Sequence, residues 1–256
     1  MGAFPKAFDD LVAGQDFLRA RSIEAIEASE ALSAHADLIK AALDVIHHFI
    51  LGRLSEEQDV LTVQHLGIRL FNGIAVAMNS TLTGYYQASA GQQRDLLETT
   101  FLLDLFSRDR SLIALWRTLD KKGRWARFKP VKVRTELDAM DGFNSLKRAE
   151  AYELLSDLAG HPSVVGFQML QAGEHGAHCG PFFEVTAMDA VLSELAKLAL
   201  QAGSAFSGLF DPMGTTDLLR KLDFLEARGK WLERFFATPF DQGEIDELRA
   251  TLVATT

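Results

Sequence analysis

A continuous helical pattern over residues 55–108 is the feature that most constrains how this chain folds. Apolar residues recur there at three- and four-residue steps, as one buried face of an α-helix requires. The predicted buried face comprises Leu61, Ile68, Phe71, Ala75, Met78, Leu82 and Tyr85. Four more apolar residues widen it until little is left for water: Leu66, Leu70, Ile74 and Ala77. A helix this apolar belongs at the centre of a fold, and we expect at most one break in it, near Gly91.

Length and composition favour a single helical domain. A chain of 256 residues with 48% hydrophobic content can bury a full core. It has many helix-forming residues, only 6 prolines and 3 tyrosines, and no series of short alternating runs. We therefore predict an all-α, long-helix bundle over residues 1–256 with a small β-hairpin inserted after residue 162. The expected parts are N-terminal helices (1–54), the long helix, a basic turn and following helices (55–162), the hairpin (163–185) and C-terminal helices (186–256).

Two local patterns set the finer expectations. Gly14 is expected to separate a short docking helix from a second helix over residues 16–51, which ends at Gly52. After Pro162 the pattern becomes extended, because residues 164–170 are rich in β-branched and large apolar side chains. A glycine-rich loop then leads to a second apolar run at 181–185. We expect these two runs to pair as the hairpin on the helical core.

Several classes of protein are disfavoured by what the sequence lacks. A single cysteine cannot form an internal disulfide, and no signal-peptide pattern occurs. No uninterrupted apolar stretch is long enough to span a bilayer, since the apolar residues 74–78 are bounded closely by Arg69, Asn72 and Asn79. We expect a cytoplasmic protein with no membrane partner. No Ser-His-Asp, Walker-type or dinucleotide glycine pattern is present, and we expect no cofactor.

Zinc-type ligands gather in two places, but neither has the spacing of a metal site. One group lies on the expected second helix: His35, His47 and His48. No two of these are four residues apart, as chelation from one helix face would need. The other group lies at the hairpin tip: His175, His178 and Cys179. No second cluster with ligand spacing follows it, so we interpret this segment as a flexible polar loop and predict no metal site.

Polar residues interrupt the apolar pattern of residues 55–108 roughly along one line: Asn72, Asn79, Thr83, Gln87, Arg94 and Glu98. Arg94 and Glu98 are four residues apart and can form an ion pair. On the surface such a pair stabilises a helix by about 0.3 kcal/mol. If buried, it persists only when both charges are also hydrogen-bonded. The sequence leaves both interpretations open, a solvated face and a buried polar cluster.

Charge is strongly segregated along the chain. Residues 107–134 contain ten basic and two acidic residues, a net charge of +8, whereas the rest has 16 basic and 33 acidic residues, a net charge of −17. Tryptophans interleave with these bases, a composition that suits contact with phosphates and stacking on exposed nucleobases. The candidate ligand-binding residues here are Trp116, Arg117, Lys121, Lys122, Arg124, Arg127 and Lys129. They predict RNA, DNA or a phosphorylated small molecule as partner, unless the bases pair with the acidic remainder and the tryptophans lie in the core.

A second set of residues carries a family resemblance. An Arg94-x-x-x-Glu98 pair precedes a Phe-Leu-Leu-Asp-Leu helix, the basic Trp-containing turn, Tyr152-x-x-Leu155-Ser156 and then His161-Pro162. Over roughly residues 57–200 this resembles a group of uncharacterised bacterial all-helical proteins. Those proteins are distantly similar to HEPN-like nucleotide- and RNA-associated domains of phage-defence and toxin systems. The resemblance implies one pocket formed by Arg94, Glu98, Tyr152, Ser156 and His161.

In that pocket the resemblance implies a catalytic role for Arg94, Glu98 and His161 and a ligand-binding role for Tyr152 and Ser156. His161 would act as acid or base, and Arg94 would stabilise a phosphate charge. The HEPN ribonuclease signature places an arginine and a histidine four to six residues apart, whereas the arginine before His161 is thirteen residues away. The same five residues also fit a structural cluster that sets the register of a bundle.

Three functions are consistent with these patterns. The first is a non-catalytic binding or regulatory module that engages nucleic acid or a phosphorylated ligand through the basic segment, in a defence- or toxin-associated setting. The second is a divergent HEPN-like ribonuclease that uses Arg94, Glu98 and His161. The third is a purely structural helical homo-oligomer. RNA cleavage that is lost on Arg94→Ala or His161→Ala would indicate the second function.

Overall fold

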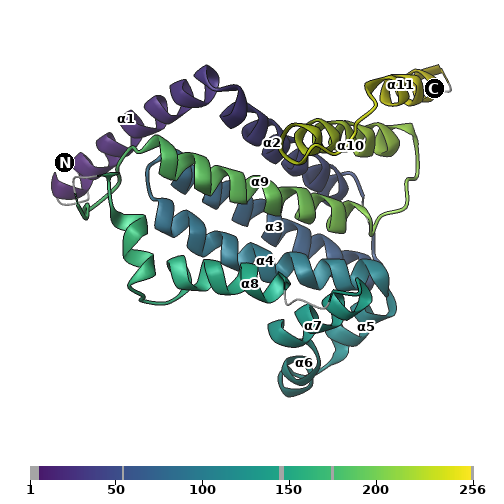
Figure 1. Ribbon diagram of the computed structural model, residues 1–256. Helices are drawn as coiled ribbons and strands as arrows, with labels where there is room; N and C mark the ends of the chain where they lie inside the picture. The colour runs from purple at the N-terminus through teal and green to yellow at the C-terminus, as the bar shows by residue number, and fades with distance from the viewer. Residues whose placement is uncertain (1–5, 54, 144–146, 174–175, 255–256) are drawn as a thin grey trace.

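The computed structural model describes residues 6–53, 55–143, 147–173 and 176–254. It is 82% helical and has no strand among these residues, which confirms the all-α prediction. The core of the bundle lies between helices that pack on one another (Figure 1): α2 (Glu30–Leu51), α3 (Gln58–Leu82), α4 (Tyr86–Arg108) and α9 (Val185–Ser207). Most of the fully buried apolar side chains come from these helices.

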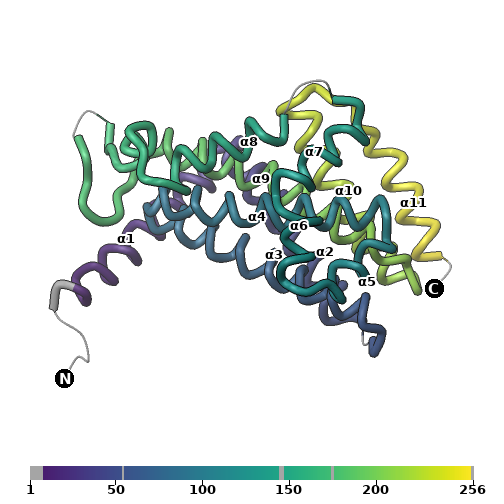
Figure 2. Tube along the Cα trace, turned by 90° about the horizontal axis from the view of Figure 1, so that it is seen from below, coloured from purple at the N-terminus to yellow at the C-terminus, as the bar shows by residue number. Residues whose placement is uncertain are grey.

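The remaining helices extend the bundle at its two ends. At one end α1 (Lys6–Ala28) projects outward, and at the other α10 (Thr215–Phe236) packs on α2 and carries α11 (Gln242–Ala254). Short helices gather around the C-terminal end of α4, as the view from below in Figure 2 shows: α5 (Ser111–Thr118), α6 (Lys121–Phe128) and α7 (Pro130–Met140). Helix α8 (Lys147–Leu155) then packs on α4 and α7.

Helices α3 and α4 are separate, so the prediction of one long helix broken near Gly91 was wrong. The chain turns at residues 83–85, and α4 packs back along α3. Gly84 has a φ angle of +81°, and a Cβ atom there would lie 2.3 Å from the backbone oxygen of Phe182. The left-handed backbone and the close approach both favour glycine at this turn. Gly91 lies inside α4.

The first two helices also divide at a different place from the predicted one. We expected a break at Gly14 and one helix over residues 16–51, but α1 continues through Gly14 to Ala28. The break falls at Ser29, which has an extended backbone and accepts a hydrogen bond from the amide of Leu32 at 3.4 Å. Serine is a favoured N-cap residue for this reason.

Helix α3 buries a different face from the predicted one. The face in the core contains the four residues that seemed only to widen it, together with one further valine and two glycines: Leu66, Leu70, Ile74, Ala77, Val63, Gly67 and Gly73. Ile68, by contrast, is 40% exposed. A Cβ atom on Gly67 would lie 2.3 Å from the ring of Phe206, and one on Gly73 would lie 2.6 Å from the side chain of Leu96. The glycines therefore select the face on which α4 and α9 approach, which apolar periodicity alone does not reveal.

The hairpin predicted over residues 163–185 is absent from the described residues. Instead, Val165–Leu170 forms a 3-10 turn (η2), and an isolated antiparallel bridge closes the loop after it. The Ser163 hydroxyl accepts a hydrogen bond from the Gly166 amide at 2.8 Å, which favours a turn over an extended strand. The Gln87 amide group on α4 holds this turn by donating to the Gly166 carbonyl at 3.0 Å. One local and one long-range hydrogen bond therefore override the β-propensity of the apolar run.

The polar residues that were expected along one line are divided by the turn at Gly84. On α3, Asn79 accepts a hydrogen bond from Arg19 of α1 at 2.6 Å. On α4, Gln87 and Arg94 instead contact the segment that follows α8. The expected continuous seam therefore becomes separate contacts on two helices.

By length and composition alone, α3 is a described helix that could cross a membrane. Its most apolar window is 44% buried in the bundle, and α3 packs on α2, α4 and α9. Core helices of proteins that never enter a membrane pass the same test, so its apolar length does not establish a membrane partner. The expectation of no membrane partner stays a prediction.

Candidate functional site

Arg94 is the centre of a polar cluster where the chain after α8 meets α4. Its Nε donates to the hydroxyl oxygen of Ser156 at 2.9 Å, and its Nη2 donates to the phenol oxygen of Tyr152. The same Nη2 lies 3.6 Å from a carboxylate oxygen of Glu98. The side chains of Arg94 and Glu98 are 27% and 31% exposed, so this ion pair is half-buried. Four of the five residues that the resemblance brought together are therefore in contact.

A π-helical turn at Ser156–Gly160 (η1) places these partners. The Ser156 hydroxyl donates to the Tyr152 carbonyl at 2.7 Å, which orients its oxygen toward Arg94. A Cβ atom on Gly160 would lie 2.9 Å from Cδ of Arg94. Glycine at this position therefore lets the arginine side chain lie across the turn.

The fifth residue, His161, lies beside this cluster without joining it. The His161 backbone amide donates to the Ser156 carbonyl at 3.0 Å, and His161 is exposed. Among the described residues, no hydrogen bond or ion pair joins its imidazole to Arg94 or Glu98. The geometry gives the Arg94 guanidinium structural partners but does not pair it with a base.

Arg134 of α7 is a member of this cluster that the sequence analysis did not single out. Its guanidinium lies 3.9 Å from the centre of the Tyr152 ring, and that of Arg94 lies 4.7 Å from it. Arg134 is only 9% exposed, and its Nε and Nη1 atoms have no hydrogen-bond partner among the described residues. Its place in the basic segment suggested a surface cation, and only the packing of α7 on α4 shows that it is buried.

Much of the basic segment over residues 107–134 is neutralised by carboxylates. Arg127 forms a bidentate pair with Glu136 at 2.7 and 2.9 Å. Arg117 lies 3.1 Å from Asp59, so an arginine predicted to bind phosphate is held by α3. Further pairs are Arg110 with Asp211 at 3.0 Å and Arg108 with Asp141 at 2.6 Å. For these four arginines the structure matches the alternative in which the bases pair with the acidic remainder of the chain.

Arg124 and Trp116 form a second unit that is largely satisfied within the protein. Arg124 donates to the carbonyls of Trp116 and Leu119, both at 2.9 Å. Its guanidinium also lies 4.8 Å from the centre of a Trp116 ring. Trp116 in turn packs edge-on against Phe106, with ring centres 6.3 Å apart. Trp116 is therefore anchored to the core rather than free in solution.

Trp125 and the lysines around it are the residues of the basic segment that internal contacts leave accessible to a ligand. Trp125 is 66% exposed. Four lysines of this segment have no ion pair with any described residue: Lys121, Lys122, Lys129 and Lys132. A cavity of about 520 Å³ lies beside α6. Its lining is largely apolar and also includes Arg69, Glu98, Trp116, Lys121, Arg124 and Trp125. This cavity thus shares Glu98 with the Arg94 cluster.

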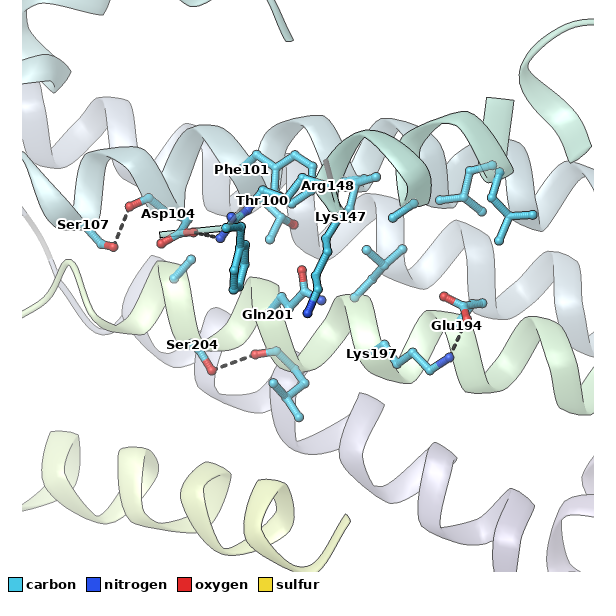
Figure 3. Close-up of a pocket in the computed structure, with 18 of the residues that line it drawn as sticks. Thr100, Phe101, Asp104, Ser107, Lys147, Arg148, Glu194, Lys197, Gln201 and Ser204 are labelled. Atoms are coloured by element: carbon cyan, nitrogen blue, oxygen red, sulfur yellow. Dashed lines mark hydrogen bonds and ion pairs between the residues drawn. The ribbon is translucent and has the colours of Figure 1, made fainter. Parts of the chain in front are cut away.

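A separate cavity of about 650 Å³ lies between α4, α8 and α9 (Figure 3). Thr100 of α4, Lys147 of α8 and Gln201 of α9 line it, and none of the residues predicted from sequence does. The only sequence signal was a polar pair, Thr99 and Thr100, inside the apolar pattern of residues 55–108. Nothing in the spacing connects that pair with α8 or α9.

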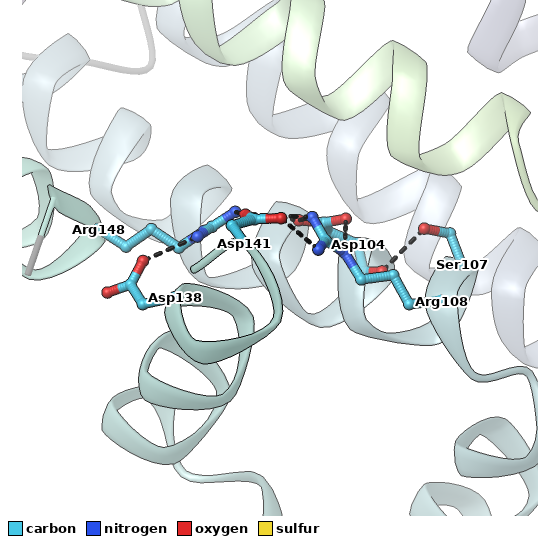
Figure 4. A network of polar contacts seen from close by, with 6 residues as sticks. All are labelled: Asp104, Ser107, Arg108, Asp138, Asp141 and Arg148. Atoms are coloured by element: carbon cyan, nitrogen blue, oxygen red, sulfur yellow. Dashed lines mark hydrogen bonds and ion pairs between the residues drawn. The ribbon is translucent and has the colours of Figure 1, made fainter. Parts of the chain in front are cut away.

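At one end of this cavity two arginines and three aspartates form a network that ties α4 to α7 and α8 (Figure 4). Arg108 donates to both oxygens of Asp104 at 2.9 and 3.1 Å and to Asp141 at 2.6 Å. Arg148 reaches Asp138 at 2.7 Å and also contacts Asp141. Hydrogen bonds from Arg108 and Arg148 lower the pKa of Asp141. Because both arginines are held by these aspartates, this network serves to hold the helices together.

The zinc-type residues do not assemble into a site in the described part of the chain. His175 lies outside the described residues. The His178 ring packs against Phe182, with ring centres 5.6 Å apart, and Cys179 is exposed. Among the described residues no group of three histidines, cysteines or acidic residues is arranged to hold a metal ion. The expectation of no metal site stays a prediction.

The cluster at Arg94 and the two cavities are the features to compare with known proteins. No protein-family model matches this sequence, and none of the curated proteins or solved structures compared with it is significantly similar. The HEPN-like resemblance therefore rests only on the residues from Arg94 to His161 that carry it.

Proposed function

We propose that the protein is a binding module that takes up single-stranded nucleic acid, or a single phosphorylated nucleotide-like ligand, at α6. The observation that supports this best is the 66% exposure of Trp125 on a helix that also carries Lys121 and Lys122. Stacking of a base on an aromatic side chain is worth about 1–3 kcal/mol. Lys121 lies one helical turn before Trp125 and lines the same cavity, where its ammonium group would meet a phosphate.

The number of free cations favours a short single strand over a duplex. Four arginines of the basic segment pair with carboxylates, and Arg124 and Arg134 are held by internal contacts. Four lysines remain without an ion pair among the described residues. If all four met phosphates, the logarithm of affinity for a single strand would fall with the logarithm of salt concentration with a slope of roughly −3. The cavity volume of about 520 Å³ also suits one nucleotide unit.

The alternative of a divergent HEPN-like ribonuclease has weaker support. General acid-base chemistry needs a group within hydrogen-bond reach of the proton that it moves. Within the described residues the His161 imidazole has no bond to Arg94 or Glu98, whereas Arg94 is bonded to Ser156 and Tyr152. These contacts favour a structural role for the cluster.

Fluorescence anisotropy of labelled single- and double-stranded RNA and DNA, at two salt concentrations, tests the binding proposal. We expect tighter binding of single strands, and about tenfold weaker binding after Trp125→Ala because one stacking contact is lost. Two control variants remove a similar group elsewhere: Phe17→Ala removes an aromatic side chain that is 68% exposed on α1, and Lys40→Gln removes a lysine charge whose side chain is 76% exposed on α2. Both controls should bind like the unmodified protein.

The same samples run on a gel separate the alternatives. Strand cleavage that is lost in Arg94→Ala or His161→Ala would support the ribonuclease. An affinity that does not change with salt concentration, or that is the same in Trp125→Ala and Phe17→Ala, would contradict the proposed site. No binding even at low salt would reject both nucleic-acid functions. It would leave a small phosphorylated ligand, or the structural homo-oligomer, which light scattering would detect.

A further inference from the structure

The cavity between α4, α8 and α9 has an apolar interior of a size that suits a small organic molecule. Helices α8 and α9 both pack on α4, and residues of all three helices line the cavity. The apolar lining includes Leu97, Phe101, Leu154, Leu155 and Leu198. Its volume of about 650 Å³ lies in the range usual for small-molecule sites. The cavity between α4, α8 and α9 shares one lining residue, Phe101, with the cavity beside α6.

Thr100 lines this cavity, and its buried hydroxyl group lacks a partner among the described residues. It is 2% exposed, and its Oγ1 makes no hydrogen bond with any described residue. Hydroxyl groups in helices usually bond the carbonyl four residues back, as Ser204 across the cavity does to Leu200 at 2.8 Å. A buried hydroxyl without a partner is unfavourable. A polar ligand atom in the cavity would supply the missing bond.

Four cations line the cavity, and carboxylates neutralise only two of them. Lys197 pairs with Glu194 at 2.5 Å, and Arg148 belongs to the aspartate network. Lys147 and Arg228, however, have no ion pair with the described residues, and the Lys147 ammonium lies 5.0 Å from the centre of the Phe143 ring. The Gln201 side chain lines the same cavity as Lys147 and Thr100, so amide, hydroxyl and ammonium groups accompany the apolar lining (Figure 3).

From these observations we infer that this cavity binds an amphipathic organic anion, an apolar acid whose body fills the leucine- and phenylalanine-lined interior. Lys147 and Arg228 would supply positive charge for its acidic group, and the Thr100 hydroxyl would offer a hydrogen-bond donor. The inference does not depend on nucleic-acid binding at α6. An apolar body alone would leave both cations and the hydroxyl without partners, and a small inorganic anion would leave the interior unfilled.

Two fluorescent probes that share one hydrocarbon body test this inference on the full chain. One is 1-anilinonaphthalene-8-sulfonate, and the other is 1-anilinonaphthalene, which lacks the sulfonate. We expect the sulfonate to bind at one site and about tenfold more tightly than the neutral probe, because charged hydrogen bonds contribute more than neutral ones. The double variant Lys147→Gln/Arg228→Gln should bind the two probes equally. Thr100→Val should weaken sulfonate binding with little change in side-chain shape.

A blocking variant locates the bound probe. Ala151 is an exposed residue of α8 that lines the cavity, so Ala151→Trp should fill the space without disturbing the core. Ala250→Trp, at an exposed position of α11, is the matched control. Binding should be lost in Ala151→Trp and kept in Ala250→Trp and Trp125→Ala, with unchanged circular dichroism.

Three results would overturn the inference: equal affinity of the unmodified protein for the two probes, full binding in Ala151→Trp, or failure of both competing acids to displace the sulfonate probe. The competitors are decanoate and 1-naphthoate. Displacement by decanoate would support an aliphatic acid as the natural ligand, and displacement by 1-naphthoate would support an aromatic one.

Discussion

The Nε atom of Arg94 donates to the hydroxyl oxygen of Ser156 at 2.9 Å, joining residues 62 positions apart in the sequence. This bond anchors the π-helical turn η1 to the side of α4. The same guanidinium also contacts the Tyr152 phenol and the Glu98 carboxylate. Arg94 therefore links α4 to the segment that follows α8, which makes it a test of the structural interpretation of the cluster.

We expect Arg94→Ala to lower the free energy of unfolding by about 1–2 kcal/mol, because a hydroxyl, a phenol and a carboxylate each lose a partner. Arg69→Ala is the matched control, since Arg69 also pairs with a carboxylate but its side chain is 54% exposed. That change should cost less than about 0.5 kcal/mol. Urea unfolding measures both, and equal losses in the two variants would argue against a stabilising role for the cluster.

Gly84→Ala should be clearly destabilising, by more than about 2 kcal/mol. The new side chain would adopt a left-handed backbone and also meet the Phe182 backbone, which cannot move aside like a flexible side chain. Gly142→Ala separates these two effects, because Gly142 has a φ angle of +66° and nothing lies within 4 Å of its missing Cβ. It should cost only about 1 kcal/mol. Thermal unfolding that ranks the two variants in the opposite order would contradict the turn geometry.

His35 should make the protein less stable as the solution becomes mildly acidic. Its Nδ1 accepts a hydrogen bond from Trp231 Nε1 at 2.9 Å, and its side chain is 3% exposed. Burial lowers the pKa of His35; Asp189 opposes this, and Lys197 and Arg234 add to it. A lowered pKa means that the unfolded chain takes up the proton more readily, so the contribution of His35 is complete above about pH 6.5 and declines below it.

His35→Gln tests this dependence, because glutamine can still accept a hydrogen bond but does not titrate. Between pH 8 and pH 5.5 the unmodified protein should lose about 1 kcal/mol more unfolding free energy than His35→Gln does. His65→Gln, which changes an exposed histidine of α3, should behave like the unmodified protein. The same loss in all three proteins would show that His35 does not contribute.

Asp217 should contribute stability that is lost only in strong acid. Burial by itself would raise the pKa of Asp217, but hydrogen bonds from the Met213 amide, Arg53 and His48 outweigh it and lower the pKa to about 2. The contribution, about 2 kcal/mol, should be present above pH 4 and be lost as the pH falls toward 2.

Asp217→Asn should remove most of that contribution at pH 7. It should also make the free energy of unfolding depend less on pH between pH 4 and pH 2. Asp37→Asn changes an exposed carboxylate on α2 and serves as the control. Unfolding followed by circular dichroism at several pH values distinguishes them. If Asp37→Asn flattened the profile as much as Asp217→Asn, the three bonds to Asp217 would not be its cause.

The fold class and several helix ends could be predicted because they depend on neighbouring residues. The start of α7 at Pro130 follows from the dihedral preference of proline. Helix α2 ends before Gly52 as predicted, although Gly52 keeps a right-handed φ angle of −75°. The hairpin could not be rejected from sequence in the same way. Its β-branched run was overridden by hydrogen bonds from Gln87 and to Ser163, and the Gln87 bond crosses 79 positions of the chain.

The sequence by itself determined the helical content and the segregated basic segment, because periodicity and composition are local properties. The grouping of residues around Arg94 was implied only by the family resemblance. Tertiary structure decided which face of α3 is buried, since that depends on where Phe206 and Leu96 meet its glycines. It also decided which cations stay free, because the carboxylates that neutralise Arg110 and Arg117 come from distant helices or loops. The cavity around Thr100 exists only through the packing of α8 and α9 on α4. Long-range contacts, which no local pattern encodes, therefore shaped both proposed sites.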